Sequence, residues 1–191
     1  MPQPLPKFDR PPVVETVLGV QFNRLADYSA AHAGWFWREN LGPRFDVAKE
    51  ASRLEDQFER FGDDVRWAPP GGLFVRPVHQ PDRIQIINGL DDRMVQIQDS
   101  RFIYNWRKRD AGYPSYEKLK PEFLAKLTEF EAFTQARGLG KIEQNQWEVT
   151  YHNQILRGEV WQSPQDWSRI IPSFYVPPRF QGLAFESFNN E

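Results

Sequence analysis

The sequence contains no cysteine, only three histidines, and no run of about 18 apolar residues that would suit a transmembrane helix. The lack of cysteine excludes disulfides, zinc sites with thiolate ligands and thiol nucleophiles. The histidines, His32, His79 and His152, show no metal-ligand spacing. The N-terminal residues lack the apolar core of a signal peptide. We therefore expect a soluble cytoplasmic protein with no membrane association, no metal and no cofactor.

The composition is typical of a folded domain with an aromatic core. Of 191 residues, 40% are hydrophobic and 26% are charged, and there are 15 Phe, 7 Trp and 6 Tyr. The net charge of −2 provides no overall field to attract nucleic acid, so a nucleic-acid partner is not favoured. Residues 1–12 contain five prolines and are expected to be extended, followed by a single domain over residues 13–191.

The first third of the chain predicts one strand and two helices. Residues 13–22 alternate between two faces, one of which collects Val14, Thr16, Leu18, Val20 and Phe22 and the other Glu15 and Gln21. A helix is expected over residues 27–42, with Asp27 or Ser29 as its N-cap. A second helix is expected within residues 45–62, because Val47, Ala51, Leu54, Phe58 and Phe61 form one helical stripe.

Residues 73–107 predict three or four short strands. An Asn-Gly pair at 88–89 lies between apolar runs and indicates a hairpin. A second hairpin with Asp99 and Ser100 as its turn would put Val95, Ile97, Phe102, Tyr104 and Trp106 on one face. The other face would then hold Gln96, Gln98, Arg101, Ile103, Asn105 and Arg107. This register is preferred because it buries an apolar set.

The last third predicts a long helix and two further strands. Within residues 113–140, Leu119, Phe123, Leu127, Phe130 and Phe133 form one stripe, with Gly138 as the stop. Because proline suits only the first helical turn, the regular helix is expected to begin near Pro121. Residues 146–155 alternate, with Trp147, Val149, Tyr151 and Ile155 inward and Glu148, Thr150 and His152 outward. A short helix is expected over 163–171, with Ser163 as its cap and Pro164 at its first position, and a strand over 180–191.

This order of elements predicts the α+β class. Mostly consecutive strands favour an antiparallel sheet over a doubly wound parallel one. We expect a curved antiparallel sheet packed on one face by the long Phe-rich helix, in a helix-grip or TATA-binding-protein-like arrangement.

Four segments resemble a family of proteins. They are PPVVETVLGVQF at 11–22, VQIQDSRFIYNWRK at 95–108, YPSYEKLKPEF at 113–123 and WEVTYHNQI at 147–155. In this order and spacing they resemble a sporadically distributed bacterial family of uncharacterised proteins. The resemblance implies no activity, cofactor or catalytic residue. Because members of that family tend to be longer, we expect this chain to lack the last strands or to be a natural short form.

The polar face of the sheet is the candidate site. The side chains proposed to line it are Gln96, Gln98, Arg101, Asn105, Arg107, Glu148, Thr150 and His152. Paired amide donors and acceptors suit the recognition of amide groups or base edges. The alternative is that this is the ordinary solvated face of an antiparallel sheet. Our leading hypothesis is a non-enzymatic binding or interaction module that uses this face to hold a protein or a small ligand.

Two other functions stay open. Asn105, Trp106, Arg107 and Lys108 in one strand could bind single-stranded nucleic acid by stacking and charge. Glu148 or His152 in a cleft between sheet and helix could act as an acid–base group of a small-molecule enzyme. We also expect self-association, as a homodimer or by an added strand, because a strand at 180–191 would leave an open sheet edge.

Overall fold

The computed structural model describes residues 10–57, 82–158 and 160–171. The chain divides into two compact units, residues 1–152 and 153–191. In the described part of the first unit the elements form an α+β fold, which confirms the predicted class. No helix among the described residues is long and apolar enough to cross a membrane.

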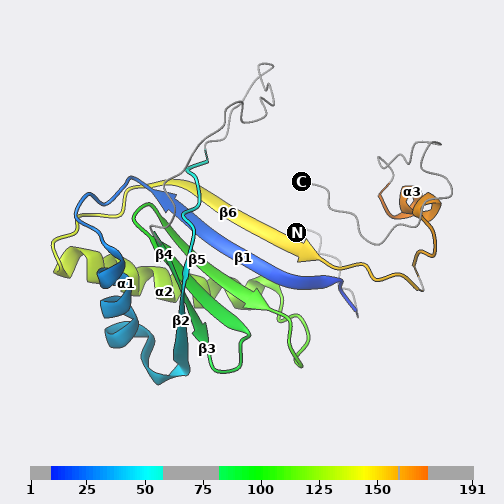
Figure 1. Cartoon of the computed structure of the whole chain (residues 1–191), viewed down its shortest axis with the longest axis horizontal. Helices are drawn as coiled ribbons and strands as arrows, with labels where there is room; N and C mark the ends of the chain where they lie inside the picture. Colours follow the sequence, from blue (N-terminus) through cyan, green and yellow to red (C-terminus); the bar gives the residue numbers. More distant parts are fainter. Residues whose placement is uncertain (1–9, 58–81, 159, 172–191) are drawn as a thin grey trace, which may run out of the picture. The chain divides into compact units, whose positions relative to one another are not determined.

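The sheet has six antiparallel strands and is not closed (Figure 1). Its strands are β1 Val13–Phe22, β2 Phe45–Ala51, β3 Arg83–Asn88, β4 Arg93–Gln98, β5 Arg101–Arg107 and β6 Gln144–Asn153. Their order across the sheet is β2-β3-β4-β5-β1-β6. Among the strands of the described residues, β2 and β6 are therefore the two edges, and β1 lies between β5 and β6.

The β4–β5 hairpin has the predicted register. Gln98 pairs with Arg101, Ile97 with Phe102 and Val95 with Tyr104. The side chains predicted to share the apolar face, Val95, Ile97, Phe102, Tyr104 and Trp106, all belong to the buried core. On the neighbouring strand β1, Leu18, Val20 and Phe22 join the same core, as the alternation predicts.

Helix α2, Tyr116–Ala136, lies along the apolar face of the sheet (Figure 1). Its predicted stripe of Leu119, Phe123, Leu127, Phe130 and Phe133 is buried. Gly138 ends it with a φ of +69°, a conformation that favours glycine. The helix begins five residues before Pro121, earlier than predicted. The first turn is retained because Leu119 is buried and its N–H bonds the carbonyl of Ser115 at 3.2 Å.

Phenylalanine rings from three elements form the centre of the core. The ring of Phe130 lies 5.1 Å from that of Phe102 on β5 and 5.3 Å from that of Phe36 on helix α1, Ala30–Phe36. The predicted first helix is confirmed, with Ser29 as its N-cap. It continues as a π-helical turn over Trp37–Leu41 and a 3-10 turn over Gly42–Arg44.

The helix predicted within residues 45–62 is wrong over its first seven residues. These form β2, which pairs with β3 through Ala48 and Ile86 and through Glu50 and Ile84. Ala, Lys and Glu favour helices locally, but the edge of β3 offers backbone hydrogen bonds that outweigh this weak preference. Residues 52–57 have no regular structure, and 58–62 lie outside the described residues.

The second unit has its own small helical turn. A 3-10 turn over Pro164–Asp166 leads into α3, Trp167–Ile170, and the hydroxyl of Ser163 lies 3.2 Å from the carboxylate of Asp166. The rings of Trp161 and Trp167 pack at 5.2 Å. The strand predicted for residues 180–191 lies outside the described residues.

Candidate binding site

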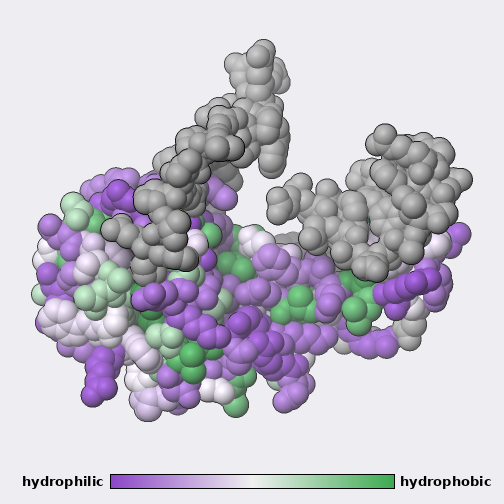
Figure 2. All heavy atoms as spheres, in the orientation of Figure 1, coloured by the Kyte–Doolittle hydropathy of each residue, from purple (hydrophilic) through white to green (hydrophobic). Residues whose placement is uncertain are grey.

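The structure brings most of the predicted site residues onto one face of the sheet, opposite α2. Gln96, Gln98, Arg101 and Asn105 are buried, with at most 5% of each residue exposed. Arg107 and Glu148 are partly buried, while Thr150 and His152 lie exposed on β6. The alternative of an ordinary solvated face is therefore wrong for the polar side chains of β4 and for Arg101 and Asn105 of β5. Hydrophilic residues cover much of the described surface that is seen in Figure 2.

The chain itself covers part of this face. We call residues 53–57, which follow β2, the covering segment. The N–H of Leu54 donates to Oε1 of Gln98 at 3.0 Å, and Nε2 of Gln98 donates to the carbonyl of Leu54 at 3.0 Å. Gln21 makes the same pair of bonds with the main chain of Gln57, at 2.8 and 2.9 Å. Each glutamine amide thus satisfies a backbone donor and acceptor as a neighbouring strand would.

Arg101 and Ser100 hold the middle of the covering segment. The Arg101 guanidinium donates to the carbonyl of Glu55 at 3.0 Å and to Oε1 of Gln21 at 2.6 Å. It also forms an ion pair with Glu148 at 3.4 Å, which compensates in part for burying its charge. The hydroxyl of Ser100 donates to the carboxylate of Asp56 at 2.8 Å.

A second set of bonds uses the other buried amides. Nε2 of Gln96 donates to Oδ1 of Asn105 at 2.8 Å, and Nδ2 of Asn105 donates to Glu15 at 2.8 Å. Oε1 of Gln96 accepts from Arg83 at 2.7 Å and from Gln85 at 3.0 Å. Since both amides already have partners within the chain, a ligand would have to displace these bonds.

Four side chains that β1 and β3 contribute to these bonds were missing from the predicted site. Gln21 and Glu15 come from β1, and Arg83 and Gln85 come from β3. The sequence pattern predicted that Glu15 and Gln21 share the outward face of their strand. It did not predict that this strand pairs with β5. The register that places Gln21 opposite Arg101 joins residues 80 positions apart in the sequence.

Residues 105–108, at the end of β5, do not present the Trp106 ring to solvent. Trp106 is 2% exposed and packs on Tyr113 with ring centroids 5.3 Å apart. Arg107 forms an ion pair with Asp91. The pKa of Arg107 is lowered, mainly because burial makes its charged form less favourable. The nearby charge of Arg109 lowers this pKa further. A base could not stack on Trp106 without opening the core.

Glu148 and His152 do not form a common acid–base site. The Glu148 carboxylate is turned toward Arg101, and its side chain crosses close over Gly19 of β1. His152 is exposed four residues further along β6. Among the residues that the structure describes, no group of three or more His, Asp or Glu side chains could hold a metal ion.

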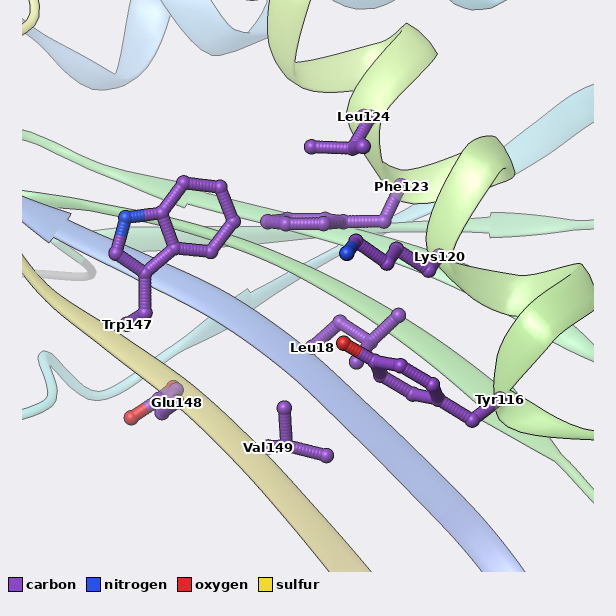
Figure 3. A pocket seen from close by; sticks show the side chains of 8 residues that line it. All are labelled: Leu18, Tyr116, Lys120, Phe123, Leu124, Trp147, Glu148 and Val149. Atoms are coloured by element: carbon purple, nitrogen blue, oxygen red, sulfur yellow. The ribbon is translucent and has the colours of Figure 1, made fainter. Parts of the chain in front are cut away.

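An open groove lies on the opposite face, between α2 and β6 (Figure 3). Its volume is about 420 Å³, and it is lined by Leu18, Tyr116, Lys120, Phe123, Leu124, Trp147, Glu148 and Val149. The Trp147 ring meets the Phe123 ring edge-on, at 5.7 Å and 85°. The ammonium of Lys120 lies 6.0 Å from the centre of the Tyr116 ring and gives the groove its cation.

The apolar side chains of β6 are only half covered. We call Trp147, Val149 and Tyr151 the β6 stripe; they are 50%, 47% and 43% exposed. The prediction that they point to the helix side is confirmed for Trp147 by its contact with Phe123, but α2 does not bury the stripe. Partial burial, followed by the influence of Tyr113, raises the pKa of Tyr151 to about 12. Tryptophan, valine and tyrosine carry no charge at neutral pH, so the stripe is uncharged.

Comparison with protein-family models, with curated proteins and with solved structures finds no match for this chain.

Proposed function

We propose that the protein is a non-enzymatic binding module and that its ligand lies in the groove between α2 and β6. The observation that carries this proposal is the half-exposed Trp147, which stands against Phe123 at the wall of an open apolar recess. A large apolar side chain left accessible beside a groove is typical of a binding surface. The polar face is a weaker candidate because its amides are already bonded within the chain.

The lining residues favour an apolar ligand with one anionic group. The groove volume of about 420 Å³ falls in the range of ordinary small-molecule sites. Trp147, Phe123 and Leu124 would contact an apolar body, while Lys120 would pair with a carboxylate or sulfonate. Glu148, the one carboxylate among the lining residues, is directed to Arg101, so it does not oppose an anion there.

Neither alternative function has a comparable supporting observation. Nucleic-acid binding through Asn105–Lys108 would need an accessible Trp106, which is in the core. Catalysis by Glu148 would need a carboxylate that is free to face the groove, and this one is engaged by Arg101, while His152 is not among the residues that line the groove.

Binding of 1-anilinonaphthalene-8-sulfonate, an aromatic anion, tests the proposal. We expect fluorescence enhancement with the wild-type chain and at least about tenfold weaker binding with Trp147→Ala. The matched control is Trp35→Ala, since Trp35 is 44% exposed on α1, away from the groove. Lys120→Met should weaken binding of this anion but not of neutral N-phenyl-1-naphthylamine. Equal binding by Trp147→Ala and Trp35→Ala would place the probe elsewhere and overturn the proposal.

A further inference from the structure

The two edges of the sheet differ in how they resist pairing with another strand. Edge strands are commonly protected by short length, charged residues, proline or bulges. Strand β2 has seven residues, three charged side chains in Asp46, Lys49 and Glu50, and a register shift near Phe45. Strand β6 has ten residues and contains no Lys, Arg or Pro. Its one carboxylate, Glu148, is ion-paired with Arg101.

The side chains of β6 are complementary to themselves in one antiparallel register. If β6 pairs with a second β6 about a two-fold axis at Val149, Trp147 lies opposite Tyr151 of the partner subunit and Val149 opposite Val149 of the partner subunit. Cross-strand partners share a face, so all three members of the β6 stripe meet apolar partners. On the other face Glu148 lies opposite Thr150 of the partner subunit, and Gln146 lies opposite His152 of the partner subunit. No like charges therefore meet.

Neighbouring registers are poorer. An axis at Glu148 would bring two carboxylates together, and an axis at Thr150 would put Trp147 opposite Asn153 of the partner subunit. The symmetry itself is allowed, because a two-fold axis perpendicular to a sheet relates antiparallel strands and keeps both α2 helices on one face.

We propose that a second copy of this chain docks along β6 and extends the sheet across a two-fold axis at Val149. The inference goes beyond the proposed ligand, since it depends on the edge and side-chain order of β6 and not on the occupancy of the groove. In this dimer Tyr151 of the partner subunit stands beside Trp147 and walls the open side of the groove. A single strand pair is a small interface, below about 1,200 Å², so we expect a reversible dimer in the micromolar range.

Sedimentation equilibrium of the full chain from 1 to 200 µM (roughly the range that brackets a micromolar Kd) tests the dimer. We expect a concentration-dependent monomer–dimer equilibrium. Val149→Lys should abolish it, because two ammonium groups would face each other at the axis. Val47→Lys is the control, since Val47 is 42% exposed on the opposite edge strand, and it should leave the equilibrium unchanged.

Cross-linking provides a second measurement if Val149→Lys does not fold. The chain has no cysteine, so Val149→Cys introduces a single thiol. Residues directly opposite in an antiparallel pair have Cβ atoms about 4.5–5.5 Å apart, within reach of a disulfide after small adjustment. Mild oxidation should give a covalent dimer with Val149→Cys and at least about tenfold less with Val47→Cys.

Three results would overturn the dimer: a monomer at every concentration without cross-linking, a dimer that persists with a folded Val149→Lys, or equal cross-linking at the two positions. These results can be distinguished from a failure of the groove proposal. If a strictly monomeric chain binds the fluorescent probe, the ligand site is supported and the dimer interface is refuted.

Discussion

Gln98 and Leu54 exchange two hydrogen bonds of 3.0 Å, one to each atom of the side-chain amide. Gln98 is 1% exposed, so solvent cannot replace either bond without local opening. The side chain of a sheet residue therefore acts here as the pairing partner of a segment that has no strand of its own. This bond pair connects the polar face to the segment that covers it.

Gln98→Glu is expected to destabilise the protein by about 1–3 kcal/mol. Glutamate keeps the acceptor for the N–H of Leu54 but repels its carbonyl, and it introduces a buried negative charge. Urea denaturation measures the loss. Thr150→Ala on β6, which is exposed, should change the free energy of unfolding by no more than about 0.5 kcal/mol. Comparable stabilities of the two variants would show that the covering segment contributes little.

Phe130→Ala should cost about 3–5 kcal/mol of stability. Its ring is fully buried and contacts Phe102, Phe36 and Phe133, so truncation leaves a cavity at the centre of the core. Leu124→Ala on the same helix is the control, because Leu124 is 37% exposed and should lose about 1 kcal/mol or less. A loss below about 1 kcal/mol for Phe130→Ala, measured in guanidinium chloride, would contradict this packing.

Stability should fall in acid partly through Glu122. Burial alone would raise the pKa of this carboxyl, but hydrogen bonds from Arg93 and Tyr104 outweigh it and hold the pKa below its ordinary value of 4.5. A depressed folded-state pKa gives stability that is present above the unfolded pKa and lost as the pH falls through the folded one.

The corresponding measurement is urea denaturation at pH 7 and pH 3.5 (about one unit below the ordinary carboxyl pKa). Wild-type protein should lose more stability between these pH values than Glu122→Gln, which has no charge to lose. Glu129→Gln on the same helix is the control. Glu129 has a similar exposure to Glu122, but its partner is Lys126 three residues away, an i,i+3 surface pair of a kind that contributes little, so this variant should resemble the wild type. If Glu122→Gln retains the full acid sensitivity, other carboxylates account for it.

Asn105→Ala should destabilise the fold by about 1–3 kcal/mol, because Nε2 of Gln96 loses its acceptor and the Glu15 carboxylate loses a donor. An accessible binding face, or a solvated one, would instead have let this substitution spare folding. Trp106→Ala should cost about 3–5 kcal/mol, as expected for a residue on the apolar face. Lys108→Ala is the exposed control. Thermal unfolding followed by circular dichroism compares the stabilities of the three variants. An Asn105→Ala variant as stable as the wild type would show that the Asn105 side chain lies on a solvated face.

The spacing of apolar residues was sufficient to predict an element where only one arrangement buries those residues together. The register of the β4–β5 hairpin follows from Ile97 and Phe102, since a shift of one residue would put both on the opposite face. The buried stripe of α2 follows in the same way from the spacing of Phe123, Leu127 and Phe130.

Non-local contacts account for what the sequence did not predict. The residues of β2 fit a helical stripe, and only the available edge of β3 selects a strand. Burial of the polar face depends on a segment 44 positions away from Gln98 in the sequence. The groove was missed because Trp147 looks like any inward residue of an alternating strand, and only the position of α2 shows that it is half exposed.

The covering segment is held at Leu54 and Gln57 by bonds to main-chain atoms, which has a consequence for mutational tolerance. Any residue with a backbone N–H can make those bonds, so the identity of the side chain at either position is weakly constrained by them, with proline as the exception. Gln21 and Gln98 have no such freedom, because an amide that both donates and accepts at that reach is specific to glutamine. In a saturation library selected for folding, positions 54 and 57 should accept most residues but exclude proline, while positions 21 and 98 should retain glutamine.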